Sequence, residues 1–208
     1  MNKSLLKDAI ALTVITLVSG LILALVQMIT KEPIIKQNEK IKQEAYQEIF
    51  PDADGFQTLD GVNPQKDAKK ALAEEGLDEG NEIEEILEAV SGDAKEKLGY
   101  VMTVTNSEAY DGQLTFTIGI RSDGTITGIS FTDISETAGL GMKAKEDSFK
   151  NQFEGKKVDR FQYTKSGAVK DNEIDALSGA TITTNSVTNG VNAAIAYYRY
   201  VSGGAVNE

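Results

Sequence analysis

An apolar segment near the N-terminus limits what this chain can fold into more than any other feature. Residues Ala9 to Ile29 are 21 amino acids without a charge, rich in Leu, Ile and Val. A helix of about 20 apolar residues crosses the hydrocarbon core of a bilayer, which is about 30 Å thick. We therefore expect residues 1–30 to form a short cytoplasmic tail and one transmembrane anchor, with residues 9–29 in contact with the lipid bilayer.

A cleaved signal peptide is the alternative interpretation of this segment, but it needs a shorter apolar core and a small-residue cleavage site. Val26-Gln27-Met28 offers no Ala-x-Ala pattern, which favours the anchor. Charge leaves the orientation open, because lysines lie on both sides of the segment: Lys3 and Lys7 before it, and Lys31, Lys36, Lys40 and Lys42 after it. A short tail and a long following domain, which translocates largely regardless of charge, favour a cytoplasmic N-terminus.

Composition excludes several kinds of site. The 208-residue chain has no Cys and no His, which rules out disulfides, thiol nucleophiles, cysteine-held iron–sulfur or zinc sites and histidine acid–base chemistry. The carboxylates show no metal-ligand spacing, so we predict no metal site and no catalytic side chain. The chain carries a formal net charge of −11, and its first 30 residues contribute +1, so the rest carries −12. Nucleic acid is not an expected partner, since phosphate backbones bind clustered Lys and Arg.

The residues that follow the anchor divide into two predicted regions. Residues 31–94 have the pattern of a helical, acidic, membrane-proximal region. A charged helix over residues 31–50 is expected to end at Phe50-Pro51, and short helical patterns such as Glu82 to Val90 follow it.

Residues 95–208 have the pattern of a small domain with a sheet. Apolar residues alternate from Leu114 to Ile120, and Asp123-Gly124 is a strong hairpin turn before Thr125 to Phe131. The pattern predicts a β-hairpin with one buried face, a bulge at Gly128 and a further strand over Tyr100 to Thr105. A helix around Phe149 to Phe153 and a final helix follow. The predicted fold class is α+β, with one N-terminal transmembrane helix and then a small antiparallel sheet flanked by helices.

A segment near the C-terminus has the composition of an anion site: Asp175-Ala-Leu-Ser178-Gly179-Ala180-Thr181-Ile-Thr183-Thr184. A helical apolar pattern from Val187 to Tyr198 follows it, so a helix is expected to begin near Thr183. The free N–H groups and the positive dipole end of a helix favour a phosphate, and Gly179 lets a bulky ligand lie close to the chain. Thr181 would then bind a phosphate or be esterified by one. The alternative is an ordinary loop whose Ser and Thr cap a helix.

A second string, Ser135-Glu136-Thr137-Ala138-Gly139-Leu140-Gly141, predicts a tight turn, because its two glycines make regular helix or strand unfavourable. Backbone N–H groups in such a turn can approach a planar ligand closely, and Glu136 and Thr137 offer it hydrogen bonds. The alternative is a surface turn with a solvated Glu.

Together the two strings resemble the motifs of a known family. Asp-x-x-Ser-Gly-Ala-Thr followed by Thr-Thr resembles the flavinylation motif of the FMN-binding domain family, found in the G subunit of the Rnf ion-translocating oxidoreductase and in the C subunit of the sodium-pumping NADH:quinone oxidoreductase. The second string is similar to that family's Ser-Glu-Thr-Pro-Gly-Leu-Gly. Ala138 replaces the proline, and Ile134 stands where a histidine often precedes the serine.

The resemblance implies a covalent cofactor and the residues around it. A flavin transferase would join the phosphate of FMN to the chain as a phosphoester, and by position the acceptor is Thr181. The expected cofactor-binding residues are Asp175, Ser178, Gly179, Ala180, Thr181, Thr183 and Thr184 in the C-terminal motif, and Glu136, Thr137, Gly139, Leu140 and Gly141 in the glycine turn.

The resemblance also implies an electron carrier in a complex of several membrane subunits, with electrons moving between ferredoxin and NAD and driving sodium ions or protons across the membrane. The domain would lie on the outer face of a prokaryotic cytoplasmic membrane. The length of the chain suits the G subunit of Rnf better than the longer C subunit of the quinone reductase, which is the alternative. A flavin reductase acting alone is disfavoured by the missing Gly-x-Gly-x-x-Gly fingerprint, and a flavin-free scaffold by the intact Asp175, Ser178, Gly179 and Thr181.

Overall fold

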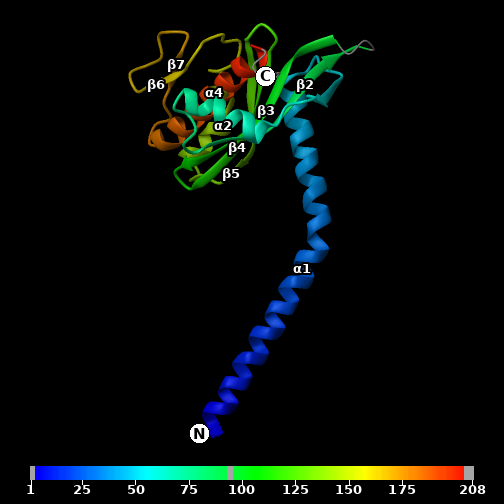
Figure 1. The fold of residues 1–208 in the computed structure, drawn as a ribbon. Helices are drawn as coiled ribbons and strands as arrows, with labels where there is room; N and C mark the ends of the chain where they lie inside the picture. Colours follow the sequence, from blue (N-terminus) through cyan, green and yellow to red (C-terminus); the bar gives the residue numbers. More distant parts are fainter. Residues whose placement is uncertain (1–2, 93–95, 204–208) are drawn as a thin grey trace. The chain divides into compact units, whose positions relative to one another are not determined.

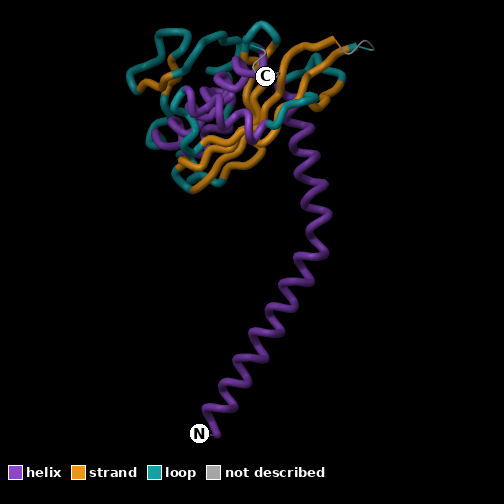
Figure 2. The backbone as a smooth tube through the Cα atoms, in the orientation of Figure 1, coloured by secondary structure: helices purple, strands orange, loops and turns teal. Residues whose placement is uncertain are grey.

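A computed structural model describes residues 3–92 and 96–203 of the chain. It divides the chain into two units, residues 1–41 and residues 42–208, which are described separately. Figure 1 shows the order of the elements along the chain, and Figure 2 shows where helix, strand and loop alternate.

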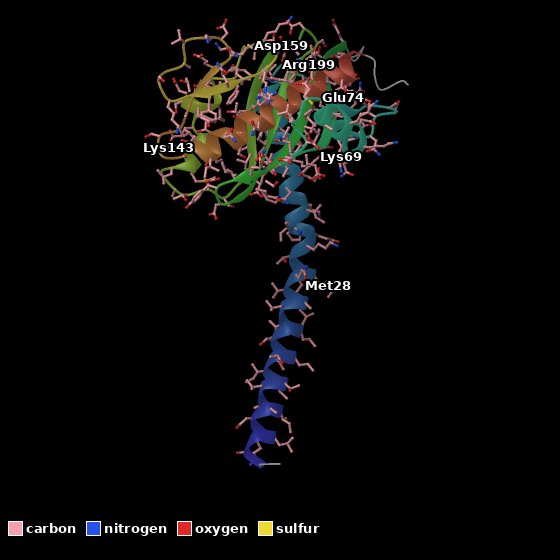
Figure 3. The ribbon with its side chains drawn as sticks, turned by 60° about the vertical axis from the view of Figure 1, so that its left-hand side comes forward. Met28, Lys69, Glu74, Lys143, Asp159 and Arg199 are labelled. Carbon is pink, nitrogen blue, oxygen red and sulfur yellow. The ribbon has the colours of Figure 1, made fainter. Side chains whose placement is uncertain are left out.

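The first unit is the N-terminal part of helix α1, which spans Lys3–Ile49. From Leu6 onward this helix is long and apolar enough to cross a membrane, and no residue of its apolar window is buried. Met28, labelled in Figure 3, is 69% exposed, and Ile29 is 71% exposed. A row of exposed apolar side chains is unfavourable in water and favourable in lipid, in agreement with the predicted anchor. The helix does not break at residue 30, and it includes Pro33.

The second unit is built on a five-stranded antiparallel sheet whose strands lie in chain order. The strands are β1 (Gly55–Thr58), β2 (Asn81–Ser91), β3 (Glu96–Ala109), β4 (Gly112–Arg121) and β5 (Ile126–Ile134). The predicted hairpin is confirmed as β4 and β5, and the Asp123 carboxylate accepts the Thr125 N–H at 2.9 Å in its turn. The predicted bulge is also confirmed: Gly119 pairs with Gly128 and Ile120 with Ile126, which leaves Thr127 as the extra residue.

Helices flank the sheet, as the α+β fold class requires. Helix α2 (Pro64–Glu74) contacts β2, and helix α4 (Thr181–Ser202) packs mainly on β3. The 3₁₀ helix η1 (Gly141–Lys145) and the one-turn helix α3 (Asp147–Lys150) follow β5. Two short parallel strands that the sequence did not reveal, β6 (Gln162–Thr164) and β7 (Glu173–Asp175), precede α4.

Both faces of the inner strands are buried, so the predicted single buried face is wrong. On β3, Tyr100 and Met102 belong to the core under α4 and α2, whereas Val101 belongs to a second cluster with Tyr46, Ile49 and Phe50 from the end of α1 and the residue after it. Successive side chains of a strand point to opposite faces, so the two clusters lie on opposite sides of the sheet. The end of α1, at Ile49, therefore covers one face of the sheet.

The helical interpretation of Glu82 to Val90 is also wrong, because this segment is the interior of β2. The strand shifts register between Ile83 and Glu85 and again between Ala89 and Val90. These irregularities break the two-residue alternation and leave apolar residues at spacings typical of a helix. Strands β2 and β3, on either side of the predicted boundary, are antiparallel neighbours in one sheet.

The contacts of α4 fix its place on the sheet. A Cβ at Gly190 would lie 2.8 Å from the Phe116 ring, so only glycine lets the helix approach so closely. The buried amide of Asn192 accepts the Phe161 N–H at 2.7 Å and donates to the Phe161 carbonyl at 3.0 Å. Helix α4 is thus tied to both the sheet and the segment that begins β6.

Removal of the Phe50 side chain should destabilise the second unit. Phe50 is fully buried against the sheet, and Phe50→Ala should lower the free energy of unfolding by about 3–5 kcal/mol because it leaves a cavity. Denaturant unfolding of the full chain in detergent, followed by circular dichroism, measures this change. Ile34→Ala, at a half-exposed position of the first unit, is the control and should leave the transition unchanged.

Glu48 should make stability depend on pH. Burial opposes its ionisation, but hydrogen bonds from Lys150 at 2.8 Å and Ser130 at 2.5 Å outweigh burial and hold the pKa of this carboxyl below its ordinary 4.5. A lowered folded-state pKa stabilises the fold above the unfolded-state pKa, and the gain is lost as pH falls. The stability difference between wild type and Glu48→Gln should therefore shrink between about pH 7 and pH 3. Exposed Glu154→Gln is the control, and a constant difference for Glu48→Gln would contradict the prediction.

Candidate functional site

Two turns of the same kind form the base of the site. In the first turn the Leu140 N–H donates to the Thr137 carbonyl at 3.1 Å, and in the second the Ala180 N–H donates to the Leu177 carbonyl at 3.0 Å. The third residue of each is a glycine in the left-handed region, Gly139 with φ +76° and Gly179 with φ +77°. A turn with positive φ at this position favours glycine. Ala138 occupies the position of the first turn at which a proline would stiffen the backbone.

The two turns pack against each other. A Cβ on Gly179 would lie 3.0 Å from Cδ2 of Leu140, so the second turn lies directly on the first. A Cβ on Gly141 would lie 2.4 Å from Oε2 of Glu136 and 2.8 Å from Oγ1 of Thr183. The missing side chain at position 141 therefore leaves room for a carboxylate and a hydroxyl from two different segments.

Helix α4 begins at Thr181 rather than near Thr183 as predicted. Its N-cap is Ala180, and within the described part of the chain no side chain caps it. Thr183 and Thr184 are buried within the first turn, and neither side chain caps the end of the helix. The first N–H groups of the helix are thus available to an anion, and the first turn holds no acidic residue.

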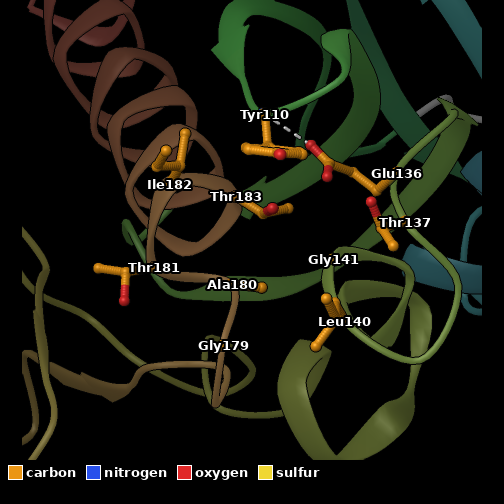
Figure 4. Close-up of a pocket in the computed structure, with 10 residues that line it drawn as sticks. All are labelled: Tyr110, Glu136, Thr137, Leu140, Gly141, Gly179, Ala180, Thr181, Ile182 and Thr183. Carbon is orange, nitrogen blue, oxygen red and sulfur yellow. Dashed lines mark hydrogen bonds between the residues drawn. The ribbon is translucent and has the colours of Figure 1, made fainter.

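A cavity of about 480 Å³ opens above the two turns. Figure 4 shows its lining residues, which come from the β3–β4 turn, the first glycine turn, the second glycine turn and the start of α4: Tyr110, Glu136, Thr137, Leu140, Gly141, Gly179, Ala180, Thr181, Ile182 and Thr183. Leu140 is 42% exposed and Ile182 is 52% exposed, so the cavity offers apolar surface to a ligand. Sites for small ligands and cofactors are typically of this size and mostly apolar.

Thr183 carries an unsatisfied polar atom in this cavity. The residue is 1% exposed, and its Oγ1 finds no hydrogen-bond partner among the residues that the structure describes. A buried hydroxyl without a partner costs about 1–3 kcal/mol. The described residues include two further buried side-chain atoms without a partner, Oγ1 of Thr127 and the OH of Tyr197, and Thr183 is the one of the three that lines this cavity.

Glu136 is already engaged with the protein. Its Oε1 accepts the Tyr110 N–H at 2.9 Å and the Asp111 N–H at 3.4 Å, and the residue is 9% exposed. The dashed line in Figure 4 marks the contact with Tyr110. One carboxylate oxygen therefore holds the β3–β4 turn at the rim of the cavity.

Thr181 lies between this cavity and a second one. The second cavity, of about 290 Å³, is lined by Lys165, Ala176, Leu177, Ser178, Gly179 and Thr181. Figure 4 shows the Thr181 side chain turned away from Glu136, Thr137 and Leu140. Among the residues that line the two cavities, all within the described ranges, Lys165 is the one cation. A group bound to the Thr181 hydroxyl thus has a cation on one side and the larger cavity on the other.

Three residues of the predicted set line neither cavity. Gly139 shapes the first turn, and Thr184 is fully buried, where its hydroxyl accepts the Leu177 N–H and donates to the Ala180 carbonyl, both at 3.0 Å. The Asp175 carboxylate accepts the Ala168 N–H at 2.6 Å. All three support the turns and loops around the site. The other predicted residues line one cavity or both, and their contact with a cofactor stays a prediction.

Five lining residues were not predicted from the sequence: Tyr110, Lys165, Ala176, Leu177 and Ile182. Ala176, Leu177 and Ile182 lie inside the predicted motif, and their place between its named residues is the signal that could have added them. Tyr110 precedes Asp111-Gly112, a turn pair that predicts a hairpin and could have placed an aromatic at its tip. Lys165 has no local signal, because it lies outside both motifs and only the fold brings it into the lining of the same cavity as Thr181.

Comparison with known proteins shows the family of the chain. A model of the FMN-binding domain matches residues 109–196, and a model of the RnfG N-terminal region matches residues 1–49. The G subunit of the Na⁺-translocating ferredoxin:NAD⁺ oxidoreductase complex of Acetobacterium woodii is 35% identical over 203 residues, which cover 96% of this chain and 94% of that one. The G subunit of the proton-translocating ferredoxin:NAD⁺ oxidoreductase complex of Clostridium ljungdahlii is 30% identical, with coverage of 93% and 91%.

A second group of relatives matches a shorter stretch. The C subunit of the Na⁺-translocating NADH-quinone reductase of Vibrio anguillarum is 39% identical over 79 residues, which cover 34% of this chain and 31% of that one.

An apolar N-terminal helix followed by a domain with this two-turn cavity defines a single-pass membrane protein with an FMN-binding domain. The chain belongs to the RnfG family, the G subunits of ion-translocating oxidoreductase complexes. The residues present fit FMN. The larger cavity has the size and apolar surface for a flat ring, Thr183 has a hydroxyl without a partner among the described residues, and the start of α4 with Lys165 suits a phosphate.

Two adjacent threonines should respond differently to loss of the hydroxyl. In the flavin-free chain, Thr184→Val should lower the free energy of unfolding by about 1–3 kcal/mol, because it removes two hydrogen bonds. Thr183→Val removes a hydroxyl for which the described residues offer no partner and should leave this free energy unchanged or raise it. Denaturant unfolding in detergent measures both. An equal loss in the two variants would show that the Thr183 hydroxyl is satisfied within the protein.

Proposed function

We propose that this protein is an electron-carrying subunit that holds FMN covalently through a phosphoester on Thr181. The observation that carries the proposal is the place of Thr181, at the uncapped start of α4 and between the two cavities. The phosphate would lie beside the first N–H groups of α4 and Lys165, and the flavin ring would lie in the larger cavity. The bond joins Oγ1 of Thr181 to phosphorus, and the chain gains one FMN less one water.

The residues of the chain hold and shield the cofactor. Leu140 and Ile182 give the ring apolar contacts, and the Thr183 hydroxyl gains the hydrogen bond that the described residues do not supply. Bound FMN supplies one- and two-electron transfer. Covalent attachment keeps the carrier in place without constant affinity for free FMN, and the membrane anchor raises its effective concentration near redox partners in the bilayer.

At the level of the complex, we propose electron transfer between ferredoxin and NAD through several membrane subunits, coupled to movement of sodium ions or protons. Family membership over nearly the whole chain supports this role. The C subunit of a quinone reductase is the second possibility, but that match covers about a third of the chain. The domain would lie on the outer face of the cytoplasmic membrane, and a flavin transferase would attach the FMN.

Intact mass and in-gel flavin fluorescence of the denatured full chain, produced with a flavin transferase, test the attachment. Wild type should gain the mass of one FMN less one water, and Thr181→Val should lose all of the gain because it lacks the acceptor oxygen. Thr58→Val is the matched control, since it removes an exposed hydroxyl on β1, away from both cavities, and should keep the flavin.

The other outcomes distinguish the alternatives. A Thr181→Val variant that keeps its flavin would contradict the assignment of the acceptor. A wild-type chain that stays unmodified beside an active transferase would favour a flavin-free scaffold. Turnover of a soluble electron donor and acceptor by the chain alone would favour an independent flavin reductase.

A further inference from the structure

The β3–β4 turn at the rim of the cavity has two backbone N–H groups that the strand ladder does not use. Ala109 pairs with Gly112, so Tyr110 and Asp111 form an exposed two-residue loop beyond the ladder. The N–H groups of such a loop are free to bond to water or to a side chain from elsewhere in the fold.

Glu136 supplies an acceptor for these N–H groups from a distant part of the chain. Its Oε1 accepts the N–H of Tyr110 at 2.9 Å and that of Asp111 at 3.4 Å, 26 and 25 residues away in sequence. The carboxylate is nearly buried, and the bare backbone of Gly141 leaves space for its second oxygen. Hydrogen bonds from N–H groups to a carboxylate are stronger than those between neutral groups, so this contact resists opening.

The contact places one side chain at the cavity. Tyr110 is 68% exposed and lines the cavity together with Ile182 and Thr183. Figure 4 shows its ring beside Thr183, extending from the turn that Glu136 holds. The ring lies at the open side, where an aromatic surface can cover a flat ligand.

We propose that Glu136 is a positioning residue, which holds the β3–β4 turn so that the Tyr110 ring covers the flavin. The flavin contact is then made by Tyr110, while Oε1 of Glu136 stays bonded to the turn. Tyr110 limits the access of water to the flavin and quenches its fluorescence. The flavin part of this inference rests on the proposed function, whereas the anchoring of the turn does not.

Hydrogen–deuterium exchange of the flavin-free full chain in detergent tests the anchoring. Mass spectrometry follows a peptide that covers residues 108–112. Glu136→Ala should speed exchange of the two turn N–H groups about 10-fold to 100-fold, the range expected for loss of a hydrogen bond to a charged group. Glu136→Gln keeps an acceptor oxygen and should stay much closer to wild type. Asp123→Ala, which removes the carboxylate from the β4–β5 turn, is the matched control and should leave residues 108–112 unchanged.

Flavin fluorescence of the covalently loaded chain, divided by flavin absorbance, tests the coupling. Tyr110→Ala and Glu136→Ala should each raise the emission and its quenching by iodide. The double variant should equal Tyr110→Ala, because Glu136 acts only through Tyr110. Glu136→Gln should stay near wild type.

Two results would overturn the inference. Exchange at residues 108–112 that is unchanged in Glu136→Ala would show that the carboxylate does not hold the turn. A further change of emission when Glu136→Ala is added to Tyr110→Ala would show that Glu136 acts on the flavin directly. A wild-type chain without covalent FMN would instead contradict the proposed function, and the exchange measurement would still decide whether Glu136 anchors the turn.

Discussion

The close packing of α4 on the inner strands is the constraint on which the rest of the structure depends. Gly190 brings the helix against the Phe116 ring, and Asn192 ties it to the backbone of Phe161. A helix held at its middle has a fixed N-terminus, so Thr181 and Thr183 are placed by contacts more than one turn away. The site needs this rigidity, because both cavities end at the first residues of α4.

Some polar groups around the cavity form hydrogen bonds with the protein itself, and others have no partner within it. The Thr184 hydroxyl and the Glu136 carboxylate bond to backbone groups of neighbouring turns, so they are part of the scaffold. The Thr183 hydroxyl is as deeply buried, yet it has no partner within the described residues. Proteins accept such a cost of about 1–3 kcal/mol mainly where function requires it. Helix α4 has a second buried atom of this kind, the OH of Tyr197, and of the two Thr183 is the one that lines the cavity.

The predictions that were confirmed rest on short-range chemistry. The hairpin at Asp123-Gly124, the bulge at Gly128 and the apolar helix follow from turn residues and periodicity. The errors arise where distant segments meet. Residues 82–90 look helical because two register shifts in β2 disturb their alternation. Strand β4 looks half-exposed because no local pattern shows that the Phe50 ring, just after α1, packs against Gly119. The start of α4 was placed late, since Thr183 and Thr184 resemble caps but are buried within its first turn.

By itself the sequence determined the apolar N-terminal helix, the β4–β5 hairpin, the two glycine turns and the family resemblance, because each depends on residues that are neighbours in the chain. Only the tertiary structure decided which side chains meet. It joined Glu136 to the turn of Tyr110, brought Lys165 and Thr181 into the lining of one cavity and distinguished the hydroxyl of Thr183 from that of Thr184. The physical reason is that burial and hydrogen-bond partners are properties of packed segments, and no local pattern specifies which distant backbone group a side chain will reach.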